Sequence, residues 1–199
     1  HCNAVDGHGA LTLTQSLMRS CNDAMMNIAS RLNVQTMLKW QRLFGLGSRT
    51  GIDLPGEATG LLFTESNMSQ IDLATCSFGQ GYSSTMIQMA AAYCSILNGG
   101  YYYTPHIVRR IQDENGSTVR TVEPELVRTT VSASTCEFLK QAAYETVNGG
   151  TAGAAILEGY TVGGKTGTAQ KYPIEEHNYV ISFMGFTPVA SPELLVYVV

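Results

Sequence analysis

Two short motifs in this sequence carry side chains that could do chemistry. Ser20 and Asn22 flank Cys21, so a hydroxyl and an amide stand two residues apart where a run of helix-forming residues is interrupted. A serine there could relay a proton, and an asparagine could donate to a substrate carbonyl while accepting another hydrogen bond. Taken alone the pair is weak evidence, because serine and asparagine beside a helix usually act as N-caps.

The second motif reads Lys-Thr-Gly-Thr at residues 165–168. On a strand, side chains alternate between faces, so Lys165 would point the same way as Gly167. Thr166 and Thr168 would point the opposite way. The missing side chain at Gly167 would let a substrate backbone lie close along the strand. A lysine with hydroxyls beside it suits binding of a carboxylate, although an exposed strand with an ordinary lysine is the simpler alternative.

The same stretch also matches the phosphate-binding loop pattern G-x-x-x-x-G-K-[ST], from Gly159 to Thr166. That loop must follow a strand and open a helix, so that amide N–H groups and the helix dipole meet the phosphate. The preceding residues 151–157 look helical or irregular, and the residues that follow, up to Pro173, are poor helix formers. The sequence therefore favours the strand over nucleotide binding.

Several helices must position these motifs. Apolar residues at helical spacing predict two helices within residues 11–33, meeting at a corner around residues 20–23, where the residues favour turns and caps. Further helices are predicted over residues 36–44, 85–98 and 135–148, each ended by glycine. Capping-box spacing predicts that Ser134, with Glu137, caps the last of them.

Strands are predicted around an Asn115-Gly116 turn and in the last third of the chain. The hairpin would join residues 105–112 to residues 118–122. Later strands are predicted over residues 160–172, 179–186 and 194–199. Their short links suit antiparallel neighbours, because parallel strands need a long crossover. The predicted fold class is α+β, a mainly antiparallel sheet packed against helices.

Composition and charge argue against several classes of protein. Of the 199 residues, 44% are hydrophobic and 14% charged, which predicts a folded core. The net charge of −4 and the lack of long Lys/Arg runs argue against a nucleic-acid partner. No apolar stretch approaches the roughly 18 residues of a membrane span. The four histidines lack metal-ligand spacing, so neither a metal nor another cofactor is predicted.

Together and in this order, the two motifs resemble those of the penicillin-binding proteins. The resemblance is to class B, the monofunctional transpeptidases of division, elongation or sporulation, within the D-Ala-D-Ala peptidase and serine β-lactamase superfamily. It extends over nearly the whole chain. The segments that carry it are residues 50–57 (TGIDLPGE), residues 77–81 (SFGQG), Thr85 with residues 88–90 (QMA), residues 98–100 (NGG) ahead of Thr104-Pro105, and residues 163–170 (GGKTGTAQ).

The resemblance implies an enzyme that cross-links peptidoglycan stem peptides ending in D-Ala-D-Ala by acyl transfer, and that binds β-lactams. Ser20 would pass a proton to the leaving amine, Asn22 would hold the acyl-side amide, and Lys165 would supply positive potential. Thr166 and Thr168 would hold the carboxylate, and the Thr168 N–H would be half of an oxyanion hole. The parent protein would work with other wall-synthesis proteins, outside the bacterial cytoplasmic membrane, anchored by a membrane helix that this chain lacks.

One part of the family pattern has no match. The family's nucleophile is the serine of S-x-x-K, and no serine here has lysine three residues later. We therefore expect residues 1–199 to be a partial transpeptidase domain, lacking the upstream S-x-x-K region and a C-terminal strand and helix. The isolated chain is expected to be inactive. A β-lactam sensor domain and a non-catalytic pseudoenzyme are the alternatives, and residues 50–57 and 77–81 favour the transpeptidase over the sensor.

The chain has five cysteines and no C-x-x-C pair. Cys94 and Cys136 lie in apolar helical patterns and are predicted to be buried thiols. Because the resemblance implies a compartment where disulfides persist, Cys2 and Cys21 are a candidate redox pair. Oxidation to a disulfide would misplace Ser20 or Asn22 and reduction would restore them, which would make the pair a switch in the intact enzyme. Two separate thiols are the alternative.

Overall fold

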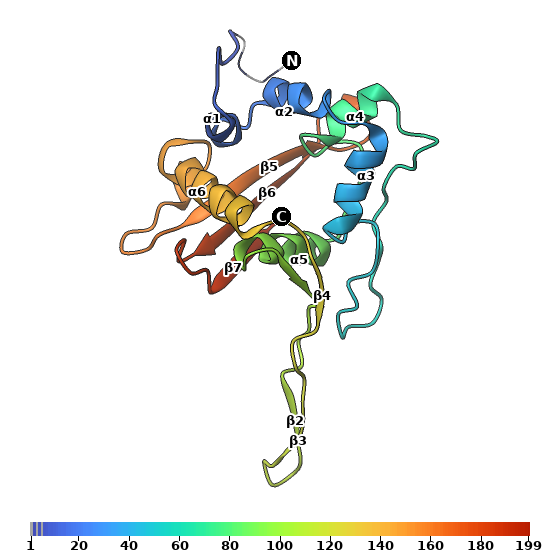
Figure 1. Ribbon diagram of the computed structural model, residues 1–199, viewed down its shortest axis with the longest axis vertical. Coiled ribbons are helices and arrows are strands. Elements are labelled where there is room, and N and C mark those ends of the chain that lie inside the picture. The colour runs from blue at the N-terminus through green and yellow to red at the C-terminus, as the bar shows by residue number, and fades with distance from the viewer. Residues whose placement is uncertain (1, 3, 5) are drawn as a thin grey trace.

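The structure is a computed structural model, and it describes residues 2, 4 and 6–199. Helices dominate the first half of the chain and a sheet forms its last part, which confirms the predicted α+β class (Figure 1). The helices are α1 (Leu13–Met18), α2 (Asn22–Ala29), α3 (Val34–Leu43), α4 (Gln70–Cys76), α5 (Met86–Leu97) and α6 (Ala133–Gly149). Among the described helices, none is long and apolar enough to cross a membrane.

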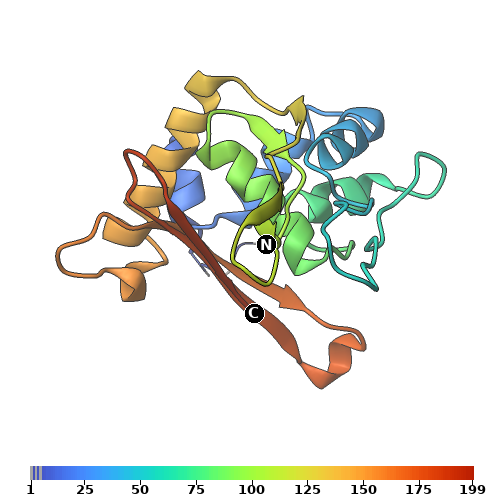
Figure 2. The same ribbon diagram turned by 90° about the horizontal axis from the view of Figure 1, so that it is seen from below.

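The three-stranded sheet has the order β5-β6-β7 and is antiparallel throughout, as the short links predicted. Its strands are β5 (Gly163–Gln170), β6 (Tyr179–Thr187) and β7 (Leu194–Val198). Figure 2 shows the helices on one side of this sheet and the other side open. On the open side Ile181, Val196 and Val198 are 71%, 47% and 57% exposed. One face of the sheet is therefore apolar and uncovered by any described element.

Two smaller hairpins complete the β structure. β2 (Arg110–Gln112) pairs with β3 (Thr118–Thr121) around the predicted turn, and this arm projects from the body of the molecule (Figure 1). β1 (Tyr101–Tyr103) pairs with β4 (Leu126–Thr129), a pairing that the sequence did not predict. Helix α4 was also missed, because it is short and lies between loops.

The corner between α1 and α2 forms where predicted. The Ser20 N–H donates to the Leu17 carbonyl at 3.1 Å, and the Cys21 N–H donates to the Ser16 carbonyl at 3.0 Å. These two bonds form a Schellman motif, in which the residue after the helix C-cap is left-handed. Ser20 occupies that position with φ +50°. The end of α1 is also tied to the end of α6, because the Thr151 N–H donates to the Met18 carbonyl at 3.1 Å.

Helix α5 buries a glutamine and leaves its cysteine exposed. Cys136 on α6 is fully buried, as predicted, but Cys94 on α5 is exposed, so that prediction was wrong. Almost all residues of α5 are apolar or small, so periodicity could not identify its inner face. Instead Gln88 is fully buried, and its amide donates to the carbonyls of Ser48 and Thr59 at 2.6 and 2.8 Å. These two hydrogen bonds hold the loop between α3 and α4 against α5.

The N-cap of α6 also differs from the prediction. Helix α6 is capped by Ser132, whose hydroxyl accepts from the Thr135 N–H at 3.2 Å, and not by Ser134.

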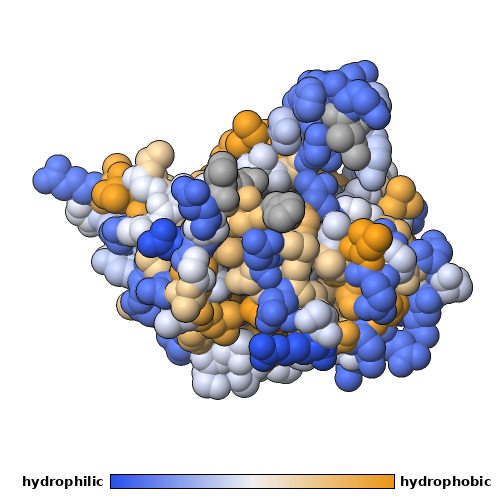
Figure 3. Space-filling view, turned by 90° about the horizontal axis from the view of Figure 1, so that it is seen from above, coloured by the Kyte–Doolittle hydropathy of each residue, from blue (hydrophilic) through white to orange (hydrophobic). Residues whose placement is uncertain are grey.

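The core beside α3 is formed by Leu38, Met68 and Cys76, with apolar neighbours packed around them. On the face seen in Figure 3, hydrophobic side chains reach the surface at several separate places among hydrophilic ones.

Candidate active site

The two motifs meet in space. Lys165 Nζ donates to Ser20 Oγ at 2.8 Å and to the backbone carbonyl of Thr166 at 2.9 Å. Burial lowers the pKa of Lys165, because its ammonium is partly removed from water. No described acidic side chain forms an ion pair with it. The site thus holds a partly desolvated cation beside an exposed serine hydroxyl.

Lys165 is held by a strand, not by a phosphate-binding loop. β5 continues from Gly163 through Gln170 in unbroken register with β6, and no helix begins after Thr166. The nucleotide-binding alternative is therefore wrong for this segment. The amide groups of the strand pair with β6 on one edge, while the other edge has no described strand beside it.

The glycines of β5 make room for side chains from β6. A Cβ on Gly163 would lie 2.5 Å from the Phe186 ring, and a Cβ on Gly164 would lie 2.5 Å from the Phe183 ring. At Gly167 a Cβ would lie 2.5 Å from Ser182 Oγ. Rotation of the Ser182 hydroxyl would relieve that contact, so the sheet alone does not require glycine at this position. Close approach of a substrate at Gly167 stays a prediction.

Ser20 occupies a position that normally belongs to glycine. A non-glycine residue in the left-handed region costs about 1–2 kcal/mol, because its Cβ crowds the following carbonyl. Ser20 has φ +50°, and its hydroxyl lies on Lys165 Nζ. Strain of this kind is frequent at functional sites. The chain thus keeps a hydroxyl where a glycine would give a more stable corner.

Asn22 and Thr168 leave hydrogen-bonding groups available. Asn22 is the first residue of α2, and no hydrogen bond engages its side-chain amide within the described part of the chain. Thr168 is exposed on β5, and its hydroxyl likewise has no partner among the described residues. The hydroxyl of Thr166 lies 3.3 Å from that of Thr151. Thr151 carried no motif signal, and only the tertiary fold brings it to the site.

The N-terminal segment brings a further group of residues to the same corner. The sulfur atoms of Cys2 and Cys21 and a ring nitrogen of His8 all lie within 4.8 Å of one another. Both cysteines are present as thiols. The spacing of the histidines gave no sign of this cluster, because the fold alone brings His8 to the cysteines. The redox pairing of Cys2 and Cys21 stays a prediction.

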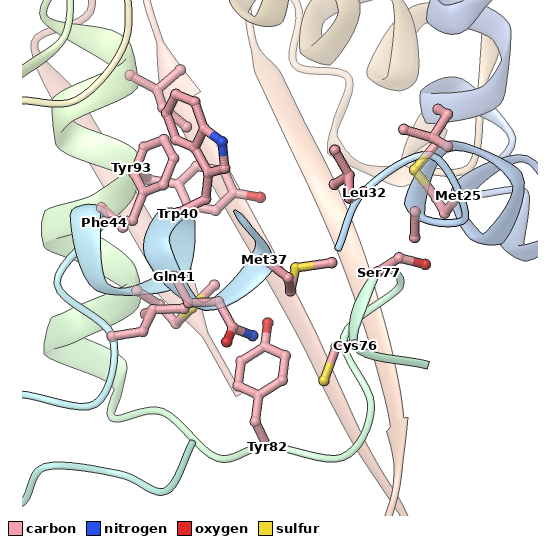
Figure 4. A pocket seen from close by; sticks show the side chains of 16 residues that line it. Met25, Leu32, Met37, Trp40, Gln41, Phe44, Cys76, Ser77, Tyr82 and Tyr93 are labelled. Atoms are coloured by element: carbon pink, nitrogen blue, oxygen red, sulfur yellow. The ribbon is translucent and has the colours of Figure 1, made fainter. Parts of the chain in front are cut away.

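An apolar cavity lies away from these residues. It has a volume of about 360 Å³ and opens between α2, α3, α4 and α5. Figure 4 shows apolar side chains such as Met37, Trp40 and Phe44 around it, with few polar atoms. Neither Ser20 nor Lys165 lines it. The cavity is lined mainly by apolar side chains and is separate from the Ser20–Lys165 site.

Comparison with known proteins identifies the family of this chain. The family described as "Penicillin binding protein transpeptidase domain" matches residues 2–199. The chain therefore belongs to the transpeptidase-domain family of the penicillin-binding proteins, and its relatives place it in class B. The family that the motifs suggested is confirmed.

Individual relatives agree over nearly all of this chain. Stage V sporulation protein D of Bacillus subtilis is 40% identical over 196 residues, covering 96% of this chain and 30% of that protein. Peptidoglycan D,D-transpeptidase MrdA of Acinetobacter baumannii is 27% identical and covers 97% and 32% respectively. The crystal structure of penicillin-binding protein 3 from Mycobacterium tuberculosis with aztreonam superposes with a TM-score of 0.82 at 31% identity. It covers 94% of this chain and 44% of that one. The chain thus spans about a third of these curated relatives' length.

Proposed function

We propose that the protein carrying this chain is a D,D-transpeptidase that cross-links peptidoglycan stem peptides ending in D-Ala-D-Ala and is acylated by β-lactams. The observation that carries the proposal is the 2.8 Å contact between Lys165 Nζ and Ser20 Oγ, which joins two distant motifs in one site. Two relatives support it: one is named a peptidoglycan D,D-transpeptidase, and another was crystallised with the β-lactam aztreonam.

Ser20 has the geometry of a proton relay. Lys165 donates to Ser20 Oγ, so the hydroxyl hydrogen of Ser20 remains available to a second acceptor. In acyl transfer a serine nucleophile attacks the penultimate carbonyl, and the bond to the terminal D-Ala nitrogen breaks. The proton lost by the nucleophile must then reach that nitrogen. Ser20 delivers it, and the charge of Lys165 stabilises the oxygen while it does so.

The other motif residues bind the substrate. The charge of Lys165 has no acidic partner among the described residues, so a terminal carboxylate can supply one, with Thr166 and Thr168 beside it. Asn22 offers an unengaged amide for the acyl-side peptide bond. The open edge of β5 allows an extended peptide to pair along the strand. The Thr168 N–H serves as one oxyanion donor.

We place the nucleophile in an S-x-x-K segment of the part of the protein that precedes this chain. A further strand and helix would follow residue 199. Two features support this proposal. The apolar face around Ile181 and Val196 is uncovered, and the cavity lined by Met37 and Trp40 is apolar. Burying such surfaces stabilises a protein by about 25 cal/mol per Å², so a complete domain would cover them.

We also place the parent protein outside the cytoplasmic membrane on a membrane anchor, where its substrate and other wall-synthesis proteins lie.

The test is acylation of the longer protein by a reporter penicillin, comparing wild type with Ser20→Gly. Glycine fits φ +50° without strain, so this variant removes the hydroxyl while keeping or improving the fold. We expect the acylation rate to fall about 10²–10⁴-fold, the range for loss of a proton-transfer group. Ser66→Ala, which changes an exposed loop hydroxyl, is the matched control. Unchanged acylation in Ser20→Gly would contradict the proposal.

A further inference from the structure

Cys2, His8 and Cys21 form a compact group of ligand atoms beside the active-site corner. Their two sulfurs and one ring nitrogen all lie within 4.8 Å of one another, and Cys2 Sγ lies 3.3 Å from His8 Nδ1. Cys21 is buried, and the other two residues are half-buried. The group is therefore partly shielded from solvent.

The local backbone directs these side chains toward one another. Cys21 is the N-cap of α2, a position that usually holds serine, threonine, aspartate or asparagine. Its side chain makes no cap hydrogen bond. His8 lies between Gly7 and Gly9, which have φ +71° and +65°, and the Gly7 N–H closes a turn on the Ala4 carbonyl at 3.0 Å. The glycines let the segment fold back, and this turn brings His8 to the cysteines.

Two thiols and an imidazole are a ligand set for zinc-class ions. Zinc binds cysteine sulfur at about 2.3 Å and histidine nitrogen at about 2.0–2.1 Å, so tetrahedral ligand atoms lie about 3.3–3.8 Å apart. The observed group needs to contract by about 1 Å at most to reach that geometry. Hard cations such as Mg²⁺ prefer oxygen ligands, so this set selects against them.

We propose that Cys2, His8 and Cys21 bind one zinc-class divalent ion, with the fourth coordination position open. Binding converts the two thiols to thiolates and releases their two protons. Because Cys21 lies between Ser20 and Asn22, the ion fastens the N-terminal segment to the corner that carries both side chains. Metal binding itself does not depend on the proposed function, whereas an effect on acylation rests on it.

Cobalt titration tests the site directly. The intact protein, reduced with a phosphine and kept free of oxygen, is titrated with Co²⁺ as the probe. We expect one equivalent to bind and to produce a thiolate-to-cobalt charge-transfer band with the visible bands of a tetrahedral centre, which Zn²⁺ then removes. Cys2→Ser and His8→Ala should each weaken binding at least tenfold. Cys21→Ser should do the same, and it should fold because serine is a better N-cap.

Cys94→Ser is the matched control, because Cys94 is exposed and far from the group in sequence; its titration should equal that of wild type. Absence of a thiolate band in the reduced wild-type protein would overturn the proposal. Equal Co²⁺ affinities of Cys2→Ser and wild type would also overturn it. So would finding a Cys2–Cys21 disulfide in the protein if the reduced form binds no Co²⁺. A protein that binds Co²⁺ but is not acylated by penicillin would refute the proposed function and leave the metal site standing.

Discussion

Glu57 and Lys165 are both half-buried charged residues in motifs shared with the family, but their surroundings differ. Glu57 accepts three hydrogen bonds from its own loop: from the Thr50 N–H and hydroxyl, both at 2.6 Å, and from the Gly51 N–H at 3.1 Å. Among the residues that the structure describes, Lys165 donates only to Ser20 Oγ and to one backbone carbonyl. An ammonium has three donors, so one remains available.

The difference separates a structural charge from a functional one. Burial raises the pKa of Glu57, but the hydrogen bonds from Thr50 and Gly51 lower it by more, so the pKa lies below its usual value. Nothing comparable compensates the burial of Lys165, whose pKa is lowered. A charge that its own loop satisfies holds the fold together. A charge that is desolvated and still has a free donor can bind an anion.

Of the substitutions that compare the two charges, Lys165→Met should have the largest effect. Removing the cation takes away both the carboxylate partner and the charge beside Ser20, so we expect penicillin acylation of the longer protein to slow about 10³-fold. Its free energy of unfolding should stay equal or rise, because a desolvated charge is lost. Lys171→Met, an exposed lysine just after β5, is the matched control and should keep its acylation rate. Stopped-flow acylation and urea unfolding measure the two quantities.

Glu57→Gln should show the reverse pattern. The neutral amide accepts more weakly from Thr50 and Gly51, so we expect the free energy of unfolding to fall by about 1.5 kcal/mol. Acylation per folded molecule should change less than twofold. Folding lowers the pKa of Glu57, so its carboxylate stabilises the folded state fully at pH values above its ordinary pKa of 4.5. This stabilisation is lost as the pH falls through the lower pKa of the folded state.

Urea midpoints measured between pH 3 and pH 7 will test this. The wild type should lose stability toward acid more steeply than Glu57→Gln. Equal slopes would show that the loop does not depend on the charge. A strong loss of acylation at full stability would place Glu57 in the active site instead.

The acylation rate at alkaline pH tests the role of the Lys165 charge. Its pKa is lowered below the ordinary 10.5, so its charge, and carboxylate binding with it, is lost as the pH rises through that lower value. Between the two values the unfolded chain binds more protons, so the free energy of unfolding rises with pH across that window. Lys165→Arg stays charged, so its acylation rate should fall only at higher pH. Coincident profiles for the two proteins would contradict this assignment.

The smallest expected effect concerns Thr151. Thr151→Val removes the hydroxyl that lies 3.3 Å from that of Thr166. Because one hydrogen bond is lost, we expect the acylation rate to fall about threefold. Thr151→Ser should restore the rate, since it keeps the hydroxyl. If both variants behave like wild type, Thr166 needs no support from the end of α6.

Much of the sheet and of the site strand could be predicted from the sequence. Residues 163–170 combine strand formers with glycines that accept the rings of Phe183 and Phe186, and turn residues isolate them. The corner at Ser20 was also visible, because Ser20, Asn22 and Asp23, which favour turns and caps, interrupt a helical pattern. Its left-handed backbone was not, because a serine stands where glycine is expected.

Other features depend on tertiary contacts that local pattern does not encode. Helix α5 is apolar around most of its circumference, so the burial of Gln88 and the exposure of Cys94 follow from the loop that packs against it. β1 is three residues long and finds its partner in β4 across the projecting hairpin. His8 joins two cysteines only because a glycine-flanked turn folds the segment back.

We propose that this chain supplies the Ser20–Lys165 relay and the substrate-binding strand to a transpeptidase whose nucleophile lies outside residues 1–199. Peptide mapping of the longer protein after labelling with a reporter penicillin tests it most directly. We predict one stoichiometric acyl adduct, on a serine that precedes residue 1 in an S-x-x-K sequence, with none on any serine of this chain. A stoichiometric adduct on Ser20, or on any other serine within residues 1–199, would contradict the account.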